Sequence, residues 1–281
     1  MTRNKSFDNN QPILYLIATP IGNLKEMSPR ALEIIEGMDI IAAEDTRNAF
    51  SLLVNYGIKK ELFSLREHNE KEASQYLLMK IKDGKKIAYM SDAGYPGISD
   101  PGYILVQEMI KNNVAVSTIS GSCAFINALV ASGLDTKHFY FHGFLSAKES
   151  EAKEELLSLE NKKETLIFYE APHRILKTLI QVRDVLGNRN ACLARELTKI
   201  NEEYIRGTLD ELISIDESTL RGEMVLIVEG NKKEECVDDQ KIIARVAYFV
   251  ELGLSQKDAI NVVSEEYNVN KNYIKKLIFK V

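Results

Sequence analysis

Short apolar segments rich in β-branched residues alternate with amphipathic segments from Ile13 onward. Apolar runs of this length predict strands buried on both faces, and the amphipathic stretches predict helices that cover them, a pattern typical of α/β domains with a parallel sheet. The strands predicted in the first part of the chain are residues 13–18, 40–43, 85–90 and 114–119. The helices predicted between and after them are residues 28–37, 48–56, 70–82, 103–112 and 123–132.

A charged segment after residue 134 interrupts this alternation, which then resumes and predicts a second α/β domain. Its predicted strands are 139–145, 165–169, 191–195 and 224–228, its predicted helices are 147–159 and 174–186, and residues 203–215 are predicted to be partly extended and partly helical. We therefore expect a disordered polar tail at 1–11, α/β domains at 12–134 and 135–230, and a linker with a helical tail at 231–281. The helices predicted in that tail are residues 240–252, 255–267 and 270–280.

Composition narrows the class of protein. Of the 281 residues, 45% are hydrophobic and 27% are charged, which is typical of a globular protein with a substantial core. The formal net charge of −5 argues against indiscriminate binding to nucleic acid, although a local basic face could still bind RNA. The polar first ten residues do not resemble a signal peptide, and the apolar stretches are too short to cross a bilayer. We therefore expect a cytoplasmic protein without a membrane partner.

The three cysteines, Cys123, Cys192 and Cys236, lack the paired spacing of a zinc site or a disulfide framework. Cys123 and Cys192 lie among apolar residues, so we interpret both as buried structural thiols.

The most informative loop is residues 91–102, which read SDAGYPGISDPG and directly follow a predicted strand. Three glycines and two prolines fix a tight backbone that a ligand can approach closely. The carboxyl end of a parallel strand is also where open α/β sheets bind ligands. We interpret the segment as a binding loop rather than a plain connection. Residues 18–24 and 120–124 follow two other predicted strands and are expected to converge on the same cleft.

Charged residues follow three further predicted strands. Glu44, Asp45 and Arg47 could hold substrate, supply a base or form a surface ion pair. His173, beside Arg174, is either structural or catalytic, and the mixed-charge run after Arg195 is either a solvated face or a substrate contact. Asp92 and Asp100 could ligate magnesium, but two lone carboxylates are too few for a hard cation, so no metal is expected.

Six strings carry a resemblance to a known family. They are ATPIGNL (18–24), AEDTR (43–47), SDAGYPGISDPG (91–102), FYEAPHR (168–174), RELTK (195–199) and RGEMVLIVEG (221–230). With these strings in this order, nearly all of residues 12–230 resembles the tetrapyrrole (corrin/porphyrin) methylase family, most closely its branch that modifies ribosomal RNA. The tail from Gln240 resembles the small helix-turn-helix-like region of that branch.

The resemblance implies two α/β domains of the class III methyltransferase type, with S-adenosylmethionine in the cleft between them, in a homodimer. The implied reaction is 2′-O-methylation of a cytidine in the decoding region of small-subunit ribosomal RNA, either as naked RNA or in the 30S particle. The cofactor contacts that it implies are Pro20, Asp92, Ala93, Gly94, Ile98, Ser122, Ala124, Glu170 and Met224.

The chain departs from the family pattern at two turns. Ser120 stands where the family usually has the proline of Pro-Gly-x-Ser-Ala, and Ser146 stands where it usually has the proline of Phe-x-Gly-Phe-Leu-Pro. Each change frees a backbone φ angle but removes no reacting group. The loop geometry is therefore in question, and the activity is not.

Methyl transfer to a ribose requires in-line alignment and an acceptor for the hydroxyl hydrogen. We hypothesise that Glu44, Asp45 or Glu170 accepts that hydrogen. Cationic side chains hypothesised to hold RNA phosphates are Arg47, Arg174, Arg195, Lys199 and Arg206. The tail lysines Lys271, Lys275, Lys276 and Lys280 form either a basic RNA-binding stripe or an ordinary solvated helix face.

Three other functions stay open from the sequence. One is a small-molecule methylase acting on a porphyrin or corrin, and another is a non-catalytic RNA- or ribosome-binding protein that uses the tail. The third is a phosphate or sugar-nucleotide enzyme, which the loops alone would allow. It is disfavoured because neither a P-loop nor a dinucleotide-binding motif accompanies them.

Overall fold

The computed structural model describes residues 12–232, 238–267 and 269–279. The tail predicted at 1–11 lies outside the described residues, as do Cys236 and Lys280. The chain divides into two compact units, residues 1–231 and residues 232–281. The domain border predicted at residue 134 falls inside the first unit and stays a prediction.

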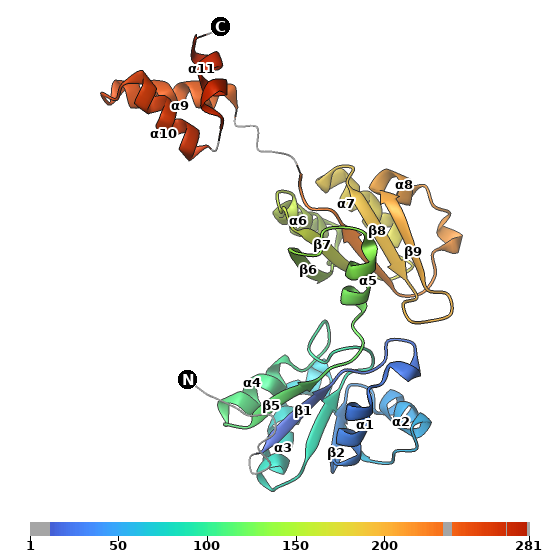
Figure 1. The fold of residues 1–281 in the computed structure, drawn as a ribbon. Helices are drawn as coiled ribbons and strands as arrows, with labels where there is room; N and C mark the ends of the chain where they lie inside the picture. Colours follow the sequence, from blue (N-terminus) through green and yellow to red (C-terminus); the bar gives the residue numbers. More distant parts are fainter. Residues whose placement is uncertain (1–11, 233–237, 268, 280–281) are drawn as a thin grey trace. The chain divides into compact units, whose positions relative to one another are not determined.

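The first unit begins with an all-parallel sheet (Figure 1), as the alternation of apolar segments predicts. In sheet order its strands are β3 (Glu61–Ser64), β2 (Ile40–Ala43), β4 (Ile87–Met90), β1 (Ile13–Ile17) and β5 (Ala115–Ile119). Its helices are α1 (Pro29–Glu36), α2 (Thr46–Asn55), α3 (Glu70–Lys82) and α4 (Tyr103–Lys111), with short 3₁₀ helices η1 (Leu24–Glu26) and η2 (Glu67–Asn69). We call residues 12–119 the first lobe.

Both faces of this sheet are buried. Helices α3 and α4 cover one face through Leu77 and Leu105, whereas α1 and α2 cover the other through Ile35 and Leu53. Strand β3 was not predicted. It is a four-residue edge strand with no fully buried side chain, so its sequence lacks the apolar signal of the central strands.

The second lobe, residues 124–231, holds a mixed sheet. In sheet order its strands are β6 (Phe139–Phe144), β7 (Thr165–Glu170), β10 (Met224–Val228), β8 (Asn190–Arg195) and β9 (Glu203–Thr208). Its helices are α5 (Ala124–Ser132), α6 (Glu149–Leu159), α7 (Ile175–Leu186) and α8 (Leu209–Ile213), with the 3₁₀ helix η3 (Glu217–Thr219). Strand β6 pairs parallel with β7, whereas β10 pairs antiparallel with both β7 and β8, so this sheet is mixed although β10 is as fully buried as a central parallel strand.

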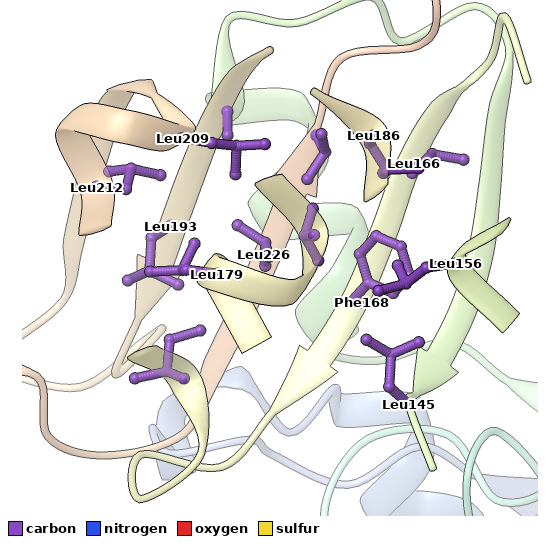
Figure 2. Close-up of a cluster of buried hydrophobic side chains, with 14 of the residues drawn as sticks. Leu145, Leu156, Leu166, Phe168, Leu179, Leu186, Leu193, Leu209, Leu212 and Leu226 are labelled. Atoms are coloured by element: carbon purple, nitrogen blue, oxygen red, sulfur yellow. The ribbon is translucent and has the colours of Figure 1, made fainter. Parts of the chain in front are cut away.

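Alternate residues of the second sheet enter two different cores. Figure 2 shows the larger one, in which Phe168 and Leu226 pack against Leu179 of α7. On the opposite face, Ile167 and Ile227 pack against α5. Helix α5 directly follows the last strand of the first sheet yet packs on the second sheet, so it joins the two lobes.

The C-terminal unit contains α9 (Asp239–Glu251), α10 (Gln256–Glu266) and α11 (Lys271–Phe279). Asp238 and Ser255 cap the first two helices by accepting backbone N–H groups. Ile242, Val246 and Ile274 belong to a small core of its own. Among the described residues of both units, no helix has the length and apolar character needed to cross a membrane.

Candidate active site

The carboxyl ends of the first sheet's strands and the ends of β7 and β10 enclose a cavity of about 300 Å³. Residues of the first lobe and of the turn before α5 that line it are Ile21, Ala93, Gly94, Tyr95, Ile98, Ser99, Asp100 and Cys123. Residues of the second lobe that line it are Ala124, Phe144, Tyr169, Glu170, Ala171, Pro172, Leu197, Glu223, Met224 and Val225. All the charged side chains in this described lining are acidic.

Loop 91–102, which forms one wall of the cavity, is held by hydrogen bonds near both ends. Thr19 N donates to Gly94 O at 2.8 Å, and Gly94 N donates to Thr19 O at 3.1 Å. At the far end, Gly102 N donates to the buried carboxylate of Glu70 at 2.8 Å. Gly102 has φ = 137°, and a Cβ there would come within 3.2 Å of the Gly97 nitrogen. A glycine is therefore required, and the loop is preorganised.

The other two predicted loops meet beside this wall. A Cβ on Gly121 would lie 2.8 Å from the carbonyl oxygen of Ala18, so the loops approach as closely as glycine permits. Ser122 Oγ donates to a carboxylate oxygen of Glu26 at 2.6 Å. These contacts confirm that loops 18–24 and 120–124 converge, although Ser120 replaces the proline usual in the family.

The acids at the ends of β2 and β4 differ in ionisation. Burial, together with the negative charges of Glu44 and Asp92, raises the pKa of Asp100 to about 6. Burial and the Asp92 charge also raise the pKa of Glu44. By contrast, hydrogen bonds from Arg47 hold the pKa of the Asp45 carboxyl below its usual range. Asp92 accepts hydrogen bonds from Asp45 N at 3.2 Å and from Asn48 Nδ2 at 2.7 Å.

Six of the predicted cofactor contacts line the cavity: Ala93, Gly94, Ile98, Ala124, Glu170 and Met224. Pro20, Asp92 and Ser122 lie outside the lining, in the loops that shape it. Asp92 and Ser122 make the hydrogen bonds described above, so these two would act by holding the loops. The assignment of all nine to cofactor binding stays a prediction.

The three predicted acid–base candidates fall into different settings. Glu44 and Asp45 are outside the cavity lining, and the Asp45 carboxylate binds Arg47 at 2.6 Å and caps α2. Glu170 lines the cavity with its side chain only 1% exposed. Its oxygens accept hydrogen bonds from Ala171 N at 2.8 Å and Thr178 Oγ1 at 2.6 Å, and Arg174 Nε lies 3.4 Å away. Glu170 is thus held by three partners of its own lobe where it lines the cavity.

The cations predicted to bind phosphate are largely engaged within the chain. Arg174 donates to the carbonyls of Leu145 and Ser146, and Arg206 donates to those of Ala131 and Ser132 at the end of α5. Ion pairs hold two others, Arg195 with Glu203 and Lys199 with Glu196 and Glu223. Arg47 differs because its side chain is 84% exposed despite its bond to Asp45. Phosphate binding by these five stays a prediction.

Several lining residues are not identified by the sequence as part of the binding site, among them Asp100, Cys123, Phe144, Tyr169 and Leu197. Asp100 lies in the predicted binding loop, but the sequence suggests it only as a metal ligand. Within the described residues no group of three or more His, Cys, Asp and Glu side chains is arranged to hold a metal. Cys192 is buried as predicted, whereas Cys123 is half-buried and faces the cavity.

Residues 13–213 match the family described as Tetrapyrrole (Corrin/Porphyrin) Methylases. The chain is 40% identical to "Ribosomal RNA small subunit methyltransferase I" of Bacillus subtilis, over 98% of this chain and 97% of that protein. It is 45% identical to the protein of the same name from Haemophilus influenzae, over 92% of this chain and 94% of that protein.

Solved structures share the fold at low identity. The methyltransferase CobJ superimposes with a TM-score of 0.59 at 14% identity, over 78% of this chain and 94% of that one. Uroporphyrin-III-C-methyltransferase from Thermus thermophilus superimposes with a TM-score of 0.55 at 16% identity, over 78% of this chain and 94% of that one. The expected class of fold is confirmed, with two α/β lobes, a cavity between them and C-terminal helices. With a family match over residues 13–213 and relatives that align over nearly its whole length, the chain belongs to the tetrapyrrole (corrin/porphyrin) methylase family.

Proposed function

We propose that this protein is an S-adenosylmethionine-dependent methyltransferase that methylates the 2′-oxygen of a cytidine in the decoding region of small-subunit ribosomal RNA. The observation that carries the proposal is 40–45% identity, over nearly the whole chain, to proteins named for methylation of small-subunit ribosomal RNA. The choice of ribose oxygen and nucleotide rests on the family resemblance.

The cavity residues fit the methyl donor. S-adenosylmethionine supplies a methyl group on a positively charged sulfur, which leaves as a neutral thioether. Asp100 places a negative charge without an ion pair in the described lining, and Glu170 and Glu223, although paired with Arg174 and Lys199, make the rest of its charged groups acidic, which favours a cationic ligand. Ile98, Leu197 and Met224 offer apolar surface to an adenosine group and exclude water. The volume of about 300 Å³ is at the low end of small-molecule sites.

The protein's main task in this reaction is alignment, because the donor carries its own leaving group. Loop 91–102, fixed by Thr19 and Glu70, holds the donor side of the cavity. The Glu170–Arg174 pair, on the opposite side, fixes the end of β7. Glu44, Asp45 and Glu170 remain candidates for accepting the hydroxyl hydrogen. Arg47, being exposed, is the best placed of the predicted cations to meet a phosphate.

A small-molecule tetrapyrrole methylase is the second candidate, because CobJ and the uroporphyrin enzyme share this fold. It is disfavoured because identity to those two is only 14% and 16%. A non-catalytic RNA-binding protein is disfavoured because it would not need a cavity of this composition.

We also propose a homodimer, a cytoplasmic location and either naked RNA or the 30S particle as substrate.

The test is to incubate the protein with methyl-labelled donor and, separately, 30S particles, naked small-subunit RNA and uroporphyrinogen. Label in a ribose methyl group of one cytidine, located by nuclease mapping, is the expected result. Label on uroporphyrinogen alone, or no donor binding in calorimetry, would refute the proposal. Size measurement in solution checks the dimer.

Deletion of residues 232–281 tests the role of the C-terminal unit. Because that unit has its own core, the remaining chain should fold and bind donor with unchanged affinity. Loss of Lys271, Lys275 and Lys276 should weaken RNA modification by about tenfold, mainly through RNA affinity. Unchanged RNA modification by the truncated chain would exclude a substrate role for the tail.

A further inference from the structure

Asp100 lies in the cavity wall on an unusually constrained turn. Ser99 before it has φ = 63°, in the left-handed region that a serine rarely adopts. The carbonyl of Pro101 after it accepts hydrogen bonds from Tyr89 Oη at 2.9 Å and Gly97 N at 3.1 Å. A left-handed serine on one side and a doubly hydrogen-bonded carbonyl on the other fix the backbone around this carboxylate, and strained residues of the first kind cluster at functional sites.

The other carboxylates near the cavity are less suited to receive a proton. Glu170 already accepts two hydrogen bonds and pairs with Arg174. Glu223 is 80% exposed and pairs with Lys199. Glu44 and Asp45 do not line the cavity. Asp100 is therefore the lining carboxylate that carries no ion pair in the described structure.

The turn faces the second lobe where a nucleoside can approach. A Cβ on Gly143 would lie 3.5 Å from Ser99 Oγ, so the turn lies against the end of β6. Phe144, the next residue, lines the cavity with 54% of its surface exposed. An exposed aromatic ring can stack on an unpaired base, which would bring the attached ribose to this end of the cavity.

We propose that Asp100 accepts the proton of the substrate hydroxyl during methyl transfer. This inference rests on the proposed function. As the oxygen–methyl bond forms and the carbon–sulfur bond of the donor breaks, the hydroxyl proton passes to the Asp100 carboxylate. The sulfur leaves as a neutral thioether, and Asp100 later releases the proton to water.

The surroundings of Asp100 suit this role. Burial is the main cause that raises its pKa to about 6, and the negative charges of Glu44 and Asp92 add to it. A hydrogen bond from Ser91 acts in the opposite direction and lowers the pKa. Burial, with a smaller contribution from the Asp100 charge, also raises the pKa values of Tyr89 and Tyr169, so both hydroxyls near it stay neutral. Near neutral pH the carboxylate is therefore ionised yet more basic than an ordinary aspartate, as a general base requires.

The test compares Asp100→Asn with the wild-type protein and with Asp83→Asn, which removes an exposed carboxyl at the end of α3. We expect Asp100→Asn to lower the single-turnover rate by about 100-fold, with Asp83→Asn unchanged. The wild-type rate should rise with pH through about 6 as Asp100 ionises. That rise should disappear in Asp100→Asn and return in part in Asp100→Glu.

Donor binding supplies a readout independent of turnover. Calorimetry should show that the affinity of the wild-type protein for the cationic donor increases between pH 5 and pH 7. The affinity of Asp100→Asn should not increase over this range. Donor binding by this variant at pH 5 also shows that it folds. A variant rate at least half that of the wild type, or a pH dependence of binding unaltered by the substitution, would overturn the inference while leaving the methyltransferase intact. A wild-type protein that methylates no RNA would instead refute the proposed function and this inference with it.

Discussion

Charged side chains are used differently in the two lobes. In the first lobe, Glu44 and Asp100 have raised pKa values because they are partly buried near other acids. In the second lobe, the charged groups at the strand ends are neutralised locally, as in the pairs Glu170–Arg174 and Arg195–Glu203. Beside the Asp45–Arg47 ion pair, the first lobe thus keeps two carboxylates with raised pKa values, whereas the paired charges of the second lobe hold its strand ends in place.

The difference shows why a charged residue at a strand end is not by itself a catalytic candidate. A carboxylate that accepts hydrogen bonds from its own lobe stabilises the fold but has little capacity left for substrate. A carboxylate that other acids surround is costly for the fold, and its basicity is available for chemistry. Substitution of a paired charge in the second lobe should therefore mainly lower the free energy of unfolding, whereas substitution of a crowded carboxylate in the first lobe should mainly change the reaction rate.

The largest expected effect is on the second lobe. Glu170→Ala leaves Thr178 and the Arg174 guanidinium without their buried partner, so it should lower the free energy of unfolding by about 3 kcal/mol. Chemical denaturation followed by circular dichroism measures the change. Glu170→Gln is the matched control, because it keeps an acceptor for Thr178 and should cost less. Equal free energies of unfolding for Glu170→Ala and the wild type would contradict the stabilising role assigned to this second-lobe carboxylate.

A smaller effect distinguishes two arginines. Arg206→Ala removes donors to the final carbonyls of α5 and should destabilise the protein by about 1 kcal/mol. Arg47→Ala should leave the unfolding midpoint unchanged because that side chain is exposed, and should weaken RNA binding in a salt-dependent manner. Thermal unfolding and filter binding separate the two. If Arg206→Ala proved neutral for stability and harmful for RNA binding, the second-lobe cations would be substrate contacts after all.

The smallest effect concerns the neighbour of Asp100. Glu44→Gln removes a negative charge that raises the Asp100 pKa, so the acid limb of the rate profile should move down by about 0.5 pH unit. The sign follows because less negative surroundings favour the ionised carboxylate. A pH series of single-turnover rates measures this shift, with Glu61→Gln, the exposed first residue of β3, as the control. A large loss of rate at every pH would instead make Glu44 the base.

Much of the fold could be predicted from the apolar pattern alone. The elements at Ile40–Ala43, Glu70–Lys82 and Met224–Val228 begin and end where the sequence predicts. The two strands are unbroken apolar runs, and the helix has apolar residues at helical spacing between polar ones, so each segment has a recognisable pattern. Edge strand β3 was not predicted because its side chains are only partly buried. The mixed strand direction of the second sheet was not predicted because a fully buried antiparallel strand such as β10 has the same composition as a parallel one.

The candidate site was predicted in its loops but not in its chemistry. The density of glycine and proline in residues 91–102 identified the cavity wall, since those residue types restrict the backbone locally. Which acids face the cavity could not be read in the same way. Asp100 and Asp45 both follow strands of one sheet, yet only Asp100 reaches the lining.

The sequence by itself determined most of the strands and helices, the positions of the tight loops and the family, because these depend on local propensity and on matching strings of residues. The tertiary structure alone decided which carboxylates are paired, which are crowded by other acids, and that α5 packs on the second sheet. The physical reason is that ionisation and burial depend on neighbours in space. In this molecule those neighbours come from strands and loops far apart along the chain.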